Sequence, residues 1–108
     1  MKVIDHGPYA WYLLEDGDDL YLDALCSHSF FDYTVLILLN AAEVAAYRKK
    51  GSAFLSKLAS DIHYSAPAVQ GSRSPFKTRN LNLGASEISR RSDAAIKAWQ
   101  ASQPQAGK

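Results

Sequence analysis

Cys26 and His28 are the two side chains most suited to chemistry in this sequence, a thiol and an imidazole two positions apart. On an extended strand they would project to the same side, as two ligands of one zinc ion must. A zinc site needs three or four ligands, and the sequence holds no second pair at CxxC or HxxxH spacing. We therefore expect no metal site and no cofactor, and we expect Cys26 to pack as a small apolar residue.

A nucleophile with a general base is the second chemistry to consider. The thiol and the serines around His28 could act as nucleophiles with that histidine as the base, or with His63 and Asp61. No nucleophile-elbow motif accompanies them, and adjacent residues on a strand point to opposite faces. We predict no catalytic residue, and a small enzyme with a cleft near His28 is the second alternative function.

Basic residues toward the C-terminus form another candidate site. Five of them could make a basic surface: Arg73, Lys77, Arg79, Arg90 and Arg91. Together with Phe76 they could hold phosphate groups while the ring stacks on a base. A small nucleic-acid-binding protein that uses residues 73–97 is therefore the first alternative function.

The distribution of charge is the most unusual feature of the sequence. The net charge of +1 conceals eight acids and one base in residues 1–43, and three acids and eleven bases in residues 44–108. We expect the folded molecule to have an acidic side and a basic side. The acidic half would repel nucleic acid, whereas an acidic protein partner or a second copy of the chain would suit this division.

Aromatic residues gather in the first third of the chain, where seven of the twelve lie between positions 9 and 33. Most should enter the core, but adjacent Phe30 and Phe31 cannot both face one side of a strand. We predict partner binding by four of these residues: Tyr12, Tyr21, Phe30 and Phe31. The leading prediction is a non-catalytic protein-interaction module that binds a protein partner through this aromatic sheet face or through the charged sides.

Three segments are predicted to be strands because aromatic, branched and other apolar residues fill them: Tyr9 to Glu15, Asp18 to Cys26 and Phe31 to Leu39. Asp16-Gly17 indicates a tight hairpin turn, because glycine accepts positive φ, and the ligand pattern of a calcium loop is missing. Pairing Leu13 with Leu20 makes one face apolar, although a longer turn would change the register and keep the faces. Lys2 to Asp5 is a candidate fourth strand.

Asn40 and Glu43 indicate a capping box, so a helix should begin near Ala41. An apolar stripe at 3.6-residue spacing runs from Val44 to Ile62 and predicts one long amphipathic helix that ends near His63. Gly51 lies inside this stripe, where a close approach to the sheet would explain it. A break into two helices at this glycine is the competing interpretation.

Residues 65–85 contain two prolines, two glycines and no sustained periodicity, so they are predicted to be a long loop where a partner could bind. Ser86 then caps a last helix that reaches about Ala101. Residues 102–108 are predicted to be a flexible tail.

The sequence therefore predicts one α+β domain over residues 1–101, an antiparallel meander of three or four strands with a long helix and a C-terminal helix packed on it. Both faces of Phe31 to Leu39 are apolar and two helices could cover only one, so homodimerisation through the other face or a sheet edge is a further hypothesis. The single cysteine, the missing secretory signal and the short apolar runs predict a cytoplasmic protein that does not enter membranes.

Overall fold

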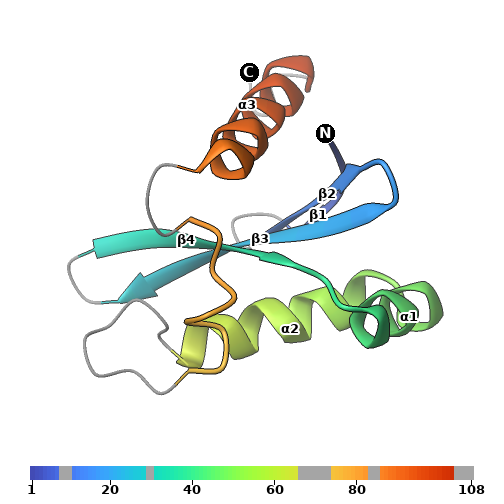
Figure 1. Ribbon diagram of the computed structural model, residues 1–108, viewed down its shortest axis with the longest axis vertical. Helices are drawn as coiled ribbons and strands as arrows, with labels where there is room; N and C mark the ends of the chain where they lie inside the picture. The colour runs from blue at the N-terminus through green and yellow to red at the C-terminus, as the bar shows by residue number, and fades with distance from the viewer. Residues whose placement is uncertain (8–10, 29–30, 66–73, 83–85, 104–108) are drawn as a thin grey trace.

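A four-stranded antiparallel sheet with helices on both faces forms the fold (Figure 1). The computed structural model describes residues 1–7, 11–28, 31–65, 74–82 and 86–103, without the side chains of residues 27, 28, 31 and 32. The elements are β1 (Lys2–Gly7), β2 (Trp11–Asp16), β3 (Asp19–His28), β4 (Phe31–Leu38), α1 (Ala41–Lys50), α2 (Ser52–Ser65) and α3 (Glu87–Ser102). The predicted α+β meander is confirmed, with the candidate fourth strand present as β1.

The turn between β2 and β3 fixes which residues face each other across the sheet. Gly17 has a φ of 63°, which glycine adopts without a steric penalty, and the ladder closes with Asp16 opposite Asp19. Leu13 therefore pairs with Leu22 and not with Leu20. This register differs by two residues from the simplest expectation, and a shift of two leaves every side chain on its expected face.

Two separate cores lie on the two faces of the sheet. The larger core joins strand residues such as Leu22 and Ile37 to the buried side of α2, where Leu55 and Ile62 are fully buried. The second core is smaller and joins buried residues of β2, β3 and β4 to half-buried residues of α3. Both faces of β4 are therefore packed, which its apolar residues on both sides require.

The long helix expected over residues 41–63 is divided at Gly51 into α1 and α2, as the competing interpretation held. Gly51 has φ 72° and ψ −153°, and its amide donates to the Tyr47 carbonyl at 2.6 Å. A Cβ atom added to Gly51 would meet no other atom within 4 Å, so a close approach to the sheet does not explain this glycine. The backbone conformation of Gly51 explains it, because residues other than glycine rarely adopt a positive φ of this kind.

A short segment around Leu81 runs along the outer edge of β4 and forms hydrogen bonds with the backbone groups of that strand. The Leu81 amide donates to the Leu36 carbonyl at 2.7 Å, and the Leu36 amide donates to Asn80 Oδ1 at 3.2 Å. Asn82 Nδ2 donates to the Thr34 carbonyl at 3.1 Å. This part of the predicted loop therefore protects an edge strand from pairing with another chain.

Among the described residues, no helix combines the length and the apolar character needed to cross a membrane.

Replacing Gly51 with alanine should destabilise the fold by about 1–3 kcal/mol, the usual cost of a non-glycine residue in this backbone region. Chemical denaturation of Gly51→Ala and of the wild type measures the difference. Ser60→Ala, at an exposed position within α2, is the matched control and should change the free energy of unfolding by less than about 0.5 kcal/mol. A neutral or stabilising Gly51→Ala would mean that one continuous helix is accessible.

Candidate functional site

Arg79, one of the predicted phosphate-binding residues, is used inside the molecule. Its guanidinium donates to both carboxylate oxygens of Glu43, at 2.6 and 2.9 Å, and to the Leu38 carbonyl at 2.8 Å. Burial raises the pKa of Glu43, but hydrogen bonds from Arg79 and from the Asn40 amide outweigh it and hold the pKa below its ordinary value. This ion pair fastens the segment after Phe76 to the start of α1.

Arg91 is also paired, and it connects α3 to the β2–β3 turn. Its Nη2 atom lies 2.8 Å from Asp16 Oδ1, and the amino group of Met1 lies 3.7 Å from the same oxygen. Of the other predicted basic residues, Lys77 and Arg90 are exposed, and Arg73 lies outside the described residues. The predicted basic residues therefore do not form one surface of unpaired positive charge, because Arg79 and Arg91 each bind an acid of the first half of the chain.

Two members of the predicted aromatic surface, Tyr12 and Tyr21, lie beneath α3. Tyr21 is only 8% exposed, and half-buried Tyr12 accepts a hydrogen bond from Gln100 Nε2 at 3.0 Å. The Trp99 ring meets Tyr12 edge-on with centroids 5.6 Å apart. Phe30 and the side chain of Phe31 lie outside the described residues.

Cys26 is buried in the larger core, as expected for a small apolar residue. Burial raises the pKa of its thiol to about 11, against a lowering contribution from a hydrogen bond with Tyr33, so the thiolate is scarce at neutral pH. The side chain of His28 lies outside the described residues. No group of three or more potential metal ligands occurs in the part of the chain that the structure describes.

Asp23 is a buried acid that the sequence reasoning did not single out. It lies on β3 between Tyr12 and Leu36 in the ladder and is only 4% exposed. Within the described residues, its carboxyl group makes no hydrogen bond and no ion pair. Burial, and secondarily the negative charge of Asp93 on α3, raises its pKa from 3.8 to about 7. A single acid within the apolar run Leu20 to Cys26 was the available signal.

The raised pKa of Asp23 makes stability depend on pH. Between about pH 4 and pH 7 the folded chain keeps this proton while the unfolded chain loses it, so stability should fall as the pH rises. Asp23→Asn should remove this loss and raise the free energy of unfolding at pH 8 by a few kcal/mol, at most about 4, since one pKa unit corresponds to about 1.4 kcal/mol.

Urea denaturation at pH 4, 6 and 8 measures this effect for wild type and Asp23→Asn. Asp18→Asn, at an exposed position, is the control and should leave the pH profile unchanged. A wild-type stability that does not decline between pH 4 and 8, or an equal decline in Asp23→Asn, would contradict the assignment.

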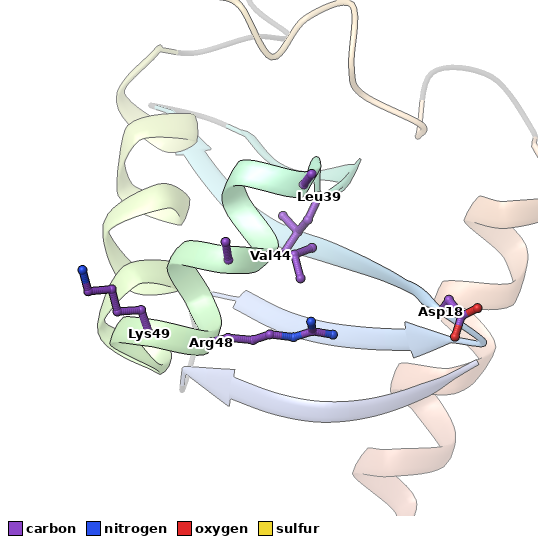
Figure 2. A pocket seen from close by; sticks show the side chains of 7 residues that line it. Asp18, Leu39, Val44, Arg48 and Lys49 are labelled. Atoms are coloured by element: carbon purple, nitrogen blue, oxygen red, sulfur yellow. The ribbon is translucent and has the colours of Figure 1, made fainter.

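A depression of about 710 Å³ lies between α1 and the β2–β3 turn (Figure 2). Leu39 and Val44 belong to the larger core, so the depression is on the side of the sheet that α3 does not cover. Seven residues line it: Asp18, Leu39, Ala41, Val44, Ala45, Arg48 and Lys49. In Figure 2 the Arg48 side chain extends toward the turn that carries Asp18, whereas Lys49 points away from that turn. The depression is thus apolar along α1 and charged at its two ends.

The last turn of α1 carries three exposed bases, Arg48, Lys49 and Lys50. None of them forms an ion pair with any residue that the structure describes. Cations at a helix C-terminus interact favourably with the helix dipole, which is a structural reason for their presence. The basic set predicted from the sequence did not include these residues, although three consecutive bases were the available signal.

Comparison with protein-family models, with curated proteins and with solved structures found no match to this chain.

Proposed function

We propose that the chain is a non-catalytic protein-interaction module that binds a segment of a partner protein in the depression beside α1. The observation that carries the proposal is the end of α1, where bases that pair with no described residue border a concave apolar surface. The occupant is a peptide segment that combines acidic side chains with at least one apolar side chain.

Charge complementarity is the reason for an acidic partner. Arg79 and Arg91 are already neutralised by Glu43 and Asp16, so the remaining positive charge near the depression belongs to Arg48 and its two neighbours. Acidic groups of a partner would meet these bases without displacing an existing ion pair. Such contacts favour specificity and rapid association.

The apolar lining and Asp18 favour a peptide over a nucleic acid. Val44 and the alanines of α1 offer contact area to an apolar side chain. A peptide can supply such a side chain, whereas a phosphate backbone cannot. Asp18 and neighbouring Asp19 are exposed, and they would repel a polyanion that crossed the depression. A peptide avoids this repulsion by placing a neutral or basic residue at that end.

The charged side is preferred to the aromatic sheet face because α3 covers Tyr12 and Tyr21. The catalytic alternative is not favoured, because burial raises the pKa of the Cys26 thiol and leaves little thiolate to act as a nucleophile. Homodimerisation stays a hypothesis, and the edge of β4 is a poor candidate for it because Asn80, Leu81 and Asn82 already bind there.

Selection from a displayed library of random twelve-residue peptides tests the proposal directly. We expect the enriched peptides to carry acidic residues next to apolar ones. Fluorescence anisotropy with one labelled peptide should show affinity about tenfold weaker, or more, for the double variant Arg48→Glu and Lys49→Glu, because each of two contacts becomes repulsive. Affinity should also fall with added salt.

The matched control is the double variant Lys77→Glu and Lys97→Glu, which changes the net charge equally at exposed positions that do not line the depression. It should retain affinity within about threefold, since distant surface charges are screened. Equal losses in both variants, or enriched peptides without acidic residues, would refute the proposal. Single-stranded nucleic acid bound through Arg48 and Lys49, or self-association in sedimentation lost in the Arg48/Lys49 variant, would identify a different occupant and also refute it.

A further inference from the structure

The second core is closed by a helix that packs less completely than α2 does. Four residues of α2 are buried, namely Leu55, Leu58, Ala59 and Ile62. In α3 the single buried residue is the polar Ser92, and the apolar side chains that touch the sheet, Ile88, Ala95 and Ile96, are half-buried. The cover on this face is therefore the weaker of the two.

The face beneath α3 contains a charge that the helix does not match. Asp23 is only 4% exposed, and its carboxyl group has no partner among the described residues. The charged group of α3 that acts on it is Asp93. Asp93 and Gln100 are seven residues apart and share one side of the helix, and Gln100 binds Tyr12, the neighbour of Asp23 in the ladder. Asp93 itself is exposed, so the helix places a negative charge near a buried carboxylate that requires a cation.

We infer that the sheet face beneath α3 is a docking surface for an amphipathic helix that carries a lysine or arginine opposite Asp23, and that α3 is its replaceable cover. The apolar contacts would come from Leu14, Tyr21 and Leu36, against which α3 packs in the structure. The basic residue would take the place of Asp93 and give the buried carboxylate its missing partner. This surface is distinct from the depression beside α1, on the opposite face of the sheet.

A helix in a groove is a common mode of recognition, with anchors at three- and four-residue spacing. The occupant must also compete with α3, which is held locally by being part of the same chain. The Arg91–Asp16 ion pair is one contact that α3 would lose, and it is exposed enough to be worth little. A basic anchor at Asp23 is therefore the decisive difference between the incoming helix and α3.

The first test places the cation in the chain itself. Asp93→Lys should slow hydrogen exchange of the α3 amides at least tenfold at pH 8, where Asp23 is mostly ionised, relative to the amides of α2. The effect should vanish in the Asp23→Asn background, because the lysine then has no buried anion to meet. The neutral variant Asp93→Ala separates removal of the repulsion from formation of the new pair.

The second test supplies the helix from outside. Peptides with the sequence of residues 86–103 carry either Lys or Ala at position 93. They are titrated into the full chain bearing Arg91→Glu, in which the ion pair between α3 and Asp16 is replaced by a repulsion between two acids. The lysine peptide should bind at least tenfold more tightly than the alanine peptide, and this preference should disappear when Asp23→Asn is added. Isothermal titration calorimetry gives both constants.

Two results would overturn the inference. The first is an equal preference for the lysine peptide in the chains with and without Asp23→Asn, since the attraction would then come from the acidic half of the molecule in general. The second is an α3 exchange rate that Asp93→Lys leaves unchanged or increases, since the position of Asp93 would then not face the buried acid.

Discussion

The need to cover two apolar faces of one small sheet governs this structure. β3 and β4 alternate apolar residues toward both sides, so Val35 and Ile37 enter one core while Leu36 enters the other. A sheet of this kind is stable only between two layers, and the chain supplies them with α1 and α2 on one face and α3 on the other (Figure 1). The segment around Leu81 completes the enclosure by binding the edge of β4.

The features that could be predicted from the sequence are those that residues close together in the chain determine. The turn at Gly17, the capping box of Asn40 and Glu43, and the apolar stripe that ends at Ile62 are local patterns, and each appears in the structure. The choice between one helix and two at Gly51 depended on a backbone angle that periodicity does not reveal. The register depended on whether Gly17 is the first or the second residue of the turn, which the residue types alone left open.

The candidate sites were harder to predict because pairing across the chain decides which charges remain available. Arg79 meets Glu43 across 36 positions, and Arg91 meets Asp16 across 75. These pairs join the basic half of the chain to the acidic half, so the two half-chain charges overstate the polarity of the folded surface. The burial of Asp23 was likewise not local, because it depends on α3 lying over that strand. The alternation of side chains along a strand places Asp23 on the opposite side of β3 from Leu22, but it does not show what covers that side.

Two electrostatic features that find no partner among the described residues carry the proposals, and they have opposite signs. The bases at the end of α1 are exposed and form no ion pair with a described residue, whereas Asp23 is buried without a partner among the described residues. Natural sequences are mostly consistent from local propensity to packing, and departures from that consistency concentrate at functional sites. An exposed cation costs little free energy and is by itself weak evidence of a binding site. Beside an apolar depression, however, it can bind a charged group of a ligand whose apolar part fills the depression. A buried carboxylate is costly at every pH above its pKa, so Asp23 is the stronger argument of the two, and it is the reason for proposing a second occupant of the face beneath α3.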